Sequence, residues 1–93
     1  MRIYKLLRDI MKMDISETNC FKITNDKFLY VENFYDEKGN WFTILELNEG
    51  REIDNKYELE KIIEIISLDY KDKKQIKEGL KFMLSRCKKR FIM

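Results

Sequence analysis

Two apolar runs joined by a short turn constrain the fold of this chain more than any other feature. Residues 27–35 (KFLYVENFY) and 41–47 (WFTILEL) are rich in aromatic and β-branched residues, and DEKGN separates them. A type I turn with Gly39 in the left-handed conformation would close the two runs into a hairpin. Tyr35 would then lie opposite Trp41. The sequence therefore predicts an antiparallel pair of strands whose register is set by this turn.

The segments that flank this hairpin predict the remaining elements. Residues 20–24 (CFKIT) have strand composition, so we expect three antiparallel strands. Apolar residues recur at helical spacing over residues 3–13, over residues 55–66, where Asn55 is placed to cap a helix, and from about residue 70 onwards. We therefore expect a single small α+β domain over all 93 residues: a helix, then a three-stranded antiparallel sheet, then two helices.

The predicted register divides the hairpin residues between two faces, and both faces are apolar. A sheet with one face in water shows a cleaner alternation of apolar and polar residues. We therefore expect another element or a partner to cover the second face. A slip of one residue would exchange the two sets. One face carries Leu29, Val31, Asn33, Tyr35, Trp41, Thr43, Leu45 and Leu47, and the other carries Phe28, Tyr30, Glu32, Phe34, Phe42, Ile44 and Glu46, joined by Phe21 and Ile23 if Asn25 and Asp26 form a two-residue turn.

Two arrangements of the helices are compatible with these faces. In the first, the three helices are divided between both sides of the sheet. In the second, the helices cover the face that carries Phe21, Phe28, Phe34 and Phe42. Tyr35 and Trp41, on the other face, then form a contact patch with neighbouring leucines for another protein or a second copy. Asp36 and Glu37 would give this patch a charged rim. A tryptophan beside a turn can also serve only to hold the hairpin end, and this interpretation stays open.

The residue types that most catalytic and metal sites need are missing. The chain has no histidine, the commonest general base and metal ligand, and its three glycines form no phosphate-binding loop. Cys20 and Cys87 have no CxxC spacing, so we expect free thiols in a reducing compartment. No apolar run reaches the roughly 18 residues of a membrane span. We therefore expect a non-catalytic cytoplasmic protein without a metal ion or cofactor.

Charge is divided unevenly along the chain. Residues 1–13 carry a net charge of +3 and residues 69–93 carry +6, whereas residues 14–68 carry −7. The last helix could bind nucleic acid, because basic side chains at this density can neutralise several phosphates. Basic residues near a helix C-terminus are also favoured by the helix dipole, so a solvated face is the alternative. The residues expected to contact nucleic acid are Lys74, Lys77, Lys81, Lys88, Lys89 and Arg90.

The acidic middle of the chain favours a protein partner. Glu46, Glu49 and Glu52 follow one another there and could present an acidic surface to the basic groove of a nucleic-acid-binding enzyme. The short, histidine-free chain, with MRIYKLLRDIMK as a first helix and strands through WFTILEL, is similar to some phage or mobile-element anti-CRISPR inhibitors. That resemblance implies a protein that binds a CRISPR effector nuclease and blocks DNA recognition with acidic side chains. The net charge of +2 and the basic last helix depart from the strongly acidic members of that class.

These features predict a stoichiometric inhibitor of a host defence nuclease, placed in the host cell cytoplasm if a phage encodes it. The alternative is a small nucleic-acid-binding accessory protein that uses the basic last helix. The sequence also leaves open a homodimer through the second sheet face. The residues expected to bind a protein partner are Tyr35, Asp36, Glu37, Trp41, Glu46, Glu49 and Glu52.

Overall fold

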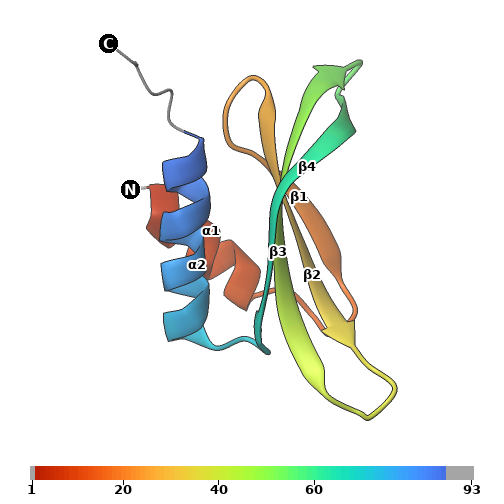
Figure 1. The fold of residues 1–93 in the computed structure, drawn as a ribbon, viewed down its shortest axis with the longest axis vertical. Coiled ribbons are helices and arrows are strands. Elements are labelled where there is room, and N and C mark those ends of the chain that lie inside the picture. The colour runs from red at the N-terminus through yellow and green to blue at the C-terminus, as the bar shows by residue number, and fades with distance from the viewer. Residues whose placement is uncertain (1, 88–93) are drawn as a thin grey trace.

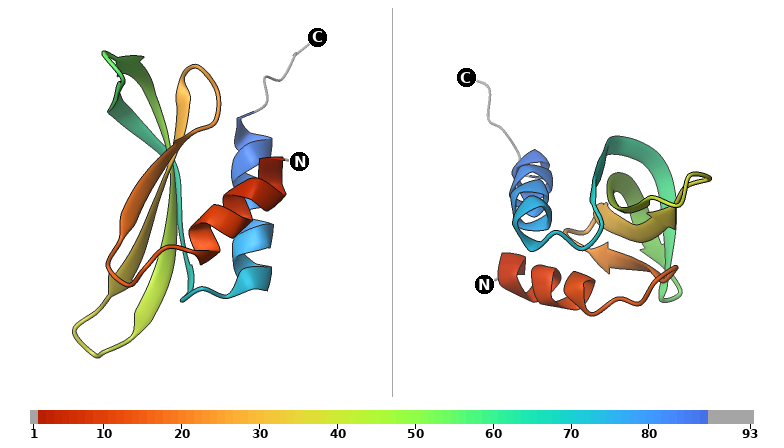
Figure 2. Two further views of the ribbon diagram at one scale, coloured as in Figure 1. Left: turned by 180° about the vertical axis from the view of Figure 1, so that it is seen from behind. Right: turned by 90° about the horizontal axis from the view of Figure 1, so that it is seen from below.

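Residues 2–87 form a four-stranded antiparallel sheet with two helices on one of its faces (Figures 1 and 2). This computed structural model describes residues 2–87. The strands lie in chain order across the sheet, and each is antiparallel to the next. The elements are α1 (Arg2–Met11), β1 (Thr18–Lys22), β2 (Lys27–Tyr35), β3 (Trp41–Ile53), β4 (Lys56–Asp69) and α2 (Lys73–Arg86).

The hairpin between β2 and β3 has the register that the sequence predicts. Tyr35 lies opposite Trp41, and the pairing continues unbroken to the start of β2. Gly39 has a φ of 86°, in the left-handed region that favours glycine. The backbone N–H of Asp36 donates to the carbonyl of Asn40 over 2.9 Å, which closes the turn. This part of the fold is therefore confirmed by the structure.

The helix predicted over residues 55–66 is wrong, because this segment forms most of strand β4. Asp54 and Asn55 have φ angles of 51° and 64°, so they form a two-residue turn that places Ile53 opposite Lys56. Left-handed residues at both central positions are typical of tight hairpins, and Asp and Asn tolerate this conformation. Asn55 is thus a turn residue and not a helix cap. The isoleucines that follow are β-branched and favour a strand once a partner strand is available.

Strand β1 pairs one residue away from the predicted register. Phe21 lies opposite Leu29, where a two-residue turn at Asn25 and Asp26 would place it opposite Tyr30. The backbone N–H groups of Ile23 and Thr24 both donate to the carbonyl of Lys27, so the loop is longer than expected. The slip moves Phe21 and Ile23 to the opposite face of the sheet. Both side chains therefore belong to the core beneath the helices.

Both helices cover the face of the sheet that carries Leu29, Leu45 and Leu47. Neither predicted arrangement of the helices is therefore correct. Leu29, Val31, Leu45 and Leu47 are at most 1% exposed and belong to one core cluster with apolar residues of α1 and α2. The first helix is close to its predicted position. Of the predicted last helix, Phe91 and its neighbours lie outside the described residues. The buried core comprises Leu6, Leu7, Ile10, Met13, Ile23, Leu29, Val31, Leu45, Leu47, Ile76, Leu80 and Met83.

A buried polar network ties two loops to the middle of the sheet. The Thr43 hydroxyl donates to Asn33 Oδ1 over 3.0 Å and accepts from the backbone N–H of Lys71 over 2.9 Å. Asn33 Nδ2 donates in turn to the carbonyl of Asp14. These bonds satisfy side chains that are at most 3% exposed, as buried polar groups require. They attach the α1–β1 loop and the β4–α2 loop to β2 and β3.

The far ends of β3 and β4 bend over the sheet face that carries no helix (Figure 2). Two irregularities in the β3–β4 pairing, beside Asn48 and beside Gly50, allow this bend. Tyr57 then lies with its ring centroid 4.7 Å from that of Phe28, which is fully buried. Lys22 and Glu52 form an ion pair of 2.8 Å between β1 and the bent hairpin. The bend therefore covers one end of this face and leaves the rest open.

Candidate functional site

The sheet face opposite the helices exposes apolar side chains of three neighbouring strands. Phe34 and Ile65 on this face are 41% and 55% exposed. Both helices lie on the opposite side of the sheet (Figure 1). Single exposed apolar residues are ordinary, but a contiguous set marks a contact site more often than not. We call this surface the open face and define it as Tyr30, Glu32, Phe34, Phe42, Ile44, Glu46 and Ile65.

Two carboxylates lie among the apolar side chains of the open face. Glu32 accepts a hydrogen bond of 3.4 Å from the Tyr30 hydroxyl, and Glu46 accepts one of 3.0 Å from Asn48 Nδ2. Neither carboxylate has an ion-pair partner among residues 2–87. Burial raises the pKa of Tyr30, and the nearby negative charge of Glu32 raises it further. The open face therefore combines rings with negative charge that no basic side chain of residues 2–87 pairs with.

Aromatic side chains occupy both sides of the β2–β3 hairpin end. Phe34 and Phe42 stack on the open face with centroids 6.5 Å apart. On the other side, the Trp41 ring lies 4.9 Å from Tyr35 and 5.4 Å from Tyr70, which the β4–α2 loop contributes. We call these five residues the aromatic end. The sequence does not predict that Tyr70 lies here, because it predicts a helix where β4 forms.

The residues at the aromatic end that are predicted to bind a partner differ in exposure and in hydrogen bonding. Tyr35 is 55% exposed, whereas Trp41 is half-buried between two tyrosine rings. The Asp36 carboxylate accepts hydrogen bonds from the backbone N–H groups of Lys38 and Asn40, each over 2.9 Å. These bonds, that from Asn40 first, lower the pKa of Asp36. Asp36 therefore holds the turn, and Tyr35 is the better placed of these residues to meet a partner.

The predicted protein-binding residues do not form one surface. Tyr35, Trp41 and their acidic neighbours lie at the β2–β3 hairpin end, whereas Glu49 and Glu52 lie toward the β3–β4 hairpin at the opposite end of the sheet (Figure 1). Glu52 is also engaged by the ion pair with Lys22. Glu46 alone lies between the two ends, on the open face. The structure thus separates Glu49 and Glu52 from the other expected contacts.

The helices form the basic side of the molecule. Together α1 and α2 carry eight lysines and arginines but only two acids, and they lie next to each other (Figure 2). A cleft of about 430 Å³ between them is lined by side chains that include Arg8, Lys12 and Lys73. Lys77 lies 5.1 Å from the ring centroid of Tyr4, which also lines this cleft. The sequence alone could not show that α1 would add to the basic surface of α2.

The basic residues predicted to contact nucleic acid are only partly described. Lys74, Lys77 and Lys81 lie on α2, and Lys81 forms a weak ion pair of 3.7 Å with Glu78. The other three, Lys88, Lys89 and Arg90, lie outside the described residues.

Three further observations concern thiol chemistry, metal binding and membrane spans. Burial raises the pKa of both free thiols, Cys20 and Cys87, which disfavours the reactive thiolate form. Within residues 2–87, no three His, Cys, Asp or Glu side chains are placed to hold a metal ion. The helices in this range are too short or too polar to cross a membrane.

Comparison with known proteins assigns no family to this chain. No family model, no curated protein and no solved structure matches it.

Proposed function

We propose that this chain is a non-catalytic binding protein that blocks another macromolecule by occupying its surface. Its target, on this proposal, is a host defence nuclease or a similar enzyme that handles nucleic acid, such as a CRISPR effector, in the cytoplasm of the host cell. The resemblance to small anti-CRISPR inhibitors suggests this target class. The binding surface would be the aromatic end together with the adjoining open face.

One observation carries the proposal: rigid aromatic rings surround unpaired carboxylates on a face that no helix covers. Aromatic residues dominate the binding energy of protein interfaces, and acidic groups beside them favour a basic partner surface. Glu32 and Glu46 lie on this face without a basic counterpart among residues 2–87. A groove that binds nucleic acid is basic, so it is complementary to this surface.

An affinity pull-down tests whether the target is a protein. The tagged chain is incubated with a lysate of its own host, with and without nuclease treatment, and retained proteins are identified by mass spectrometry. We expect one protein to remain bound in stoichiometric amount after nuclease treatment and to lose its activity in the complex. Retention that disappears with the nuclease would contradict the proposal and favour nucleic-acid binding.

Replacement of Tyr35 by alanine tests the contribution of the aromatic end to this surface. Because Tyr35 is 55% exposed, its removal should cost little stability, but loss of a hot-spot ring should weaken target binding by about 2 kcal/mol or more. Isothermal titration calorimetry with the captured target measures the affinity, and thermal unfolding measures the stability. Tyr4→Ala is the matched control, because Tyr4 is 54% exposed and lies on the helix side. Equal affinities of the two variants would place the contact elsewhere.

A second candidate function is nucleic-acid binding by the helices. The observation that favours it is the cleft between α1 and α2, which is lined by Tyr4 together with Arg8, Lys12 and Lys73. Basic side chains can neutralise phosphates, and an exposed ring can stack on an unpaired base. This function would use the side of the molecule opposite to the open face. The two candidates can therefore be separated by variants on opposite sides.

A further inference from the structure

The two helices bring basic side chains to both sides of the cleft between them. Tyr4, Arg8 and Lys12 are four residues apart in the sequence, so they lie on one side of α1. The backbone N–H of Lys12 donates to the Arg8 carbonyl over 3.2 Å, which continues the helical turn to Lys12. Lys73 and Lys77 are likewise four residues apart on α2. Lys73 lines the cleft, and Lys77 contacts the ring of Tyr4 across it.

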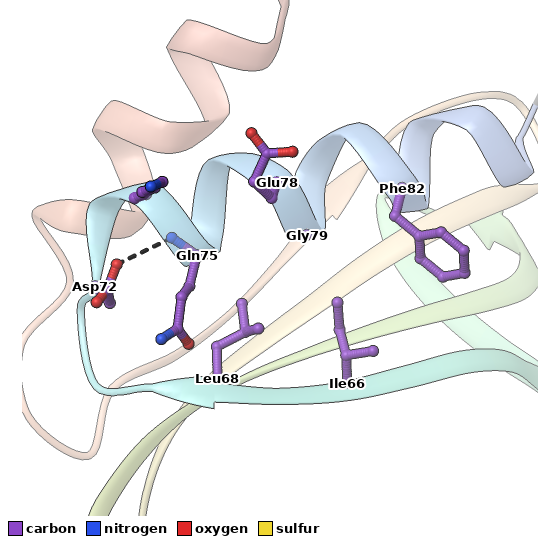
Figure 3. Close-up of a pocket in the computed structure, with 8 residues that line it drawn as sticks. Ile66, Leu68, Asp72, Gln75, Glu78, Gly79 and Phe82 are labelled. Carbon is purple, nitrogen blue, oxygen red and sulfur yellow. Dashed lines mark hydrogen bonds between the residues drawn. The ribbon is translucent and has the colours of Figure 1, made fainter.

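These basic side chains have no acidic counterpart in the described chain. No ion pair with an acid among residues 2–87 is formed by Arg8, Lys12, Lys73 or Lys77. The described residues that line the cleft include no acid. Asp72, the acid next to Lys73, instead lines the groove between α2 and β4, and its carboxylate accepts a 2.9 Å hydrogen bond from the backbone N–H of Gln75 (Figure 3). The cleft therefore favours a negatively charged ligand.

Apolar and aromatic side chains line the same cleft. Leu7 and Met11 lie beside the basic groups, the ring of Tyr4 is 54% exposed, and the volume of about 430 Å³ is typical of a small-ligand site. The Lys77 ammonium group lies 5.1 Å from the centroid of this ring. An exposed contact of this kind is weaker than the stacking of a base on a ring. A base can therefore replace the ammonium group over Tyr4, and Lys77 is then free to meet a phosphate.

We propose that the cleft binds one unpaired nucleotide of a nucleic acid strand, with the base stacked on Tyr4 and the adjoining phosphates among the basic side chains. This proposal rests on the second candidate function and narrows it from nucleic acid in general to single strands. In a duplex the bases stack on one another, so a duplex can use the basic side chains but not the ring. The cleft lies on the helix side of the sheet, so the open face stays free when a strand is bound.

Fluorescence anisotropy with the full chain tests the proposal by comparing a labelled single-stranded oligonucleotide with the same strand annealed to its complement. Phosphate contacts alone would favour the duplex, because its charge density is higher. Stacking on Tyr4 reverses this order, so we expect the single strand to bind about tenfold more tightly. A duplex that binds as tightly as the single strand would overturn the proposal and leave the second candidate function intact. Absence of binding to both would contradict that function and this proposal together.

Variants of Tyr4 test the role of the ring. Tyr4→Ala should weaken single-strand binding about tenfold or more and leave duplex binding unchanged, whereas Tyr4→Phe keeps the ring and should bind like the wild type. Tyr35→Ala is the matched control, because Tyr35 is 55% exposed but lies at the β2–β3 hairpin end. It should bind the single strand like the wild type. Circular dichroism checks the fold of each variant, and a folded Tyr4→Ala variant with wild-type affinity for the single strand would overturn the proposal.

Discussion

At the scale of single residues, hydrogen bonds decide whether an exposed acid serves the fold or a partner. Asp36 and Glu37 are neighbours in the same turn and were expected to act together as a charged rim. The Asp36 carboxylate instead accepts bonds from Lys38 and Asn40, as an Asx turn requires. Glu37 is exposed, and no hydrogen bond of its side chain is found in the described chain. Of the two, Glu37 is therefore the acid that stays available to a partner.

The lowered pKa of Asp36 predicts the direction of a pH effect. A carboxylate whose pKa is lower in the folded state stabilises the protein above its ordinary pKa, here 3.8, and this stabilisation is lost as pH falls through the lowered value. NMR titration of the Asp36 carboxyl should give a midpoint below 3.8. Asp36→Asn, which cannot titrate, should show a flatter fall in stability between about pH 5 and about pH 2. An ordinary midpoint for Asp36 would contradict this role for the side chain.

At the scale of elements, β4 shows how one segment can satisfy two periodicities. Its apolar residues fit a helical stripe, but the pairs of isoleucines also supply the alternation of a bulged strand. Pairing with β3 selects the strand over the helix, because β4 then supplies hydrogen-bond partners to the backbone of the second half of β3. Gly50 enables this pairing. A Cβ at that position would overlap the carbonyl oxygen of Glu58 across the strands.

Gly50→Ala should therefore destabilise the protein by about 2 kcal/mol or more, because backbone atoms of β4 would have to move. Denaturant unfolding measures the loss. Glu49→Ala is the matched control in the same strand, since its side chain is exposed, and it should change stability by less than about 0.5 kcal/mol. If the two variants were equally stable, the close approach of Gly50 to Glu58 would not be present in solution.

At the scale of the whole molecule, folding turns the charge pattern of the chain into two opposed sides. The two ends of the sequence are basic, and α1 and α2 bring them together on one face of the sheet. The strands carry eight acids against five basic residues and lie behind this layer. A partner will therefore meet the protein with one side or the other, depending on its own charge.

This separation predicts how nucleic-acid binding would behave if the helices carry it. Affinity for DNA or RNA should fall about a hundredfold between about 50 mM and about 200 mM salt if about four phosphates are neutralised. A double variant, Arg8→Glu with Lys73→Glu, should weaken binding and flatten this dependence. Lys56→Glu, at the far tip of the sheet, is the control and should change little. Fluorescence anisotropy measures both effects, and a salt-independent affinity would exclude the helices as the site.

Local sequence determined the parts of this protein that depend on neighbours along the chain. The β2–β3 register follows from Gly39 and the short DEKGN turn, and α1 follows from its apolar stripe. The α+β class and the basic character of the last helix could be read in the same way. Each of these rests on contacts a few residues apart, so the local pattern was sufficient.

Tertiary structure alone decided which face the helices cover, whether residues 56–69 form a strand, and which charges lie together. The β1 register differs from the expected one by a single residue, which is enough to move Phe21 into the core. Tyr70 joins Trp41 only because β4 ends beside the β2–β3 hairpin. These outcomes depend on contacts between residues far apart in the chain. A segment that fits both a helix and a strand takes the form that buries more apolar surface and satisfies more backbone hydrogen bonds in the assembled fold.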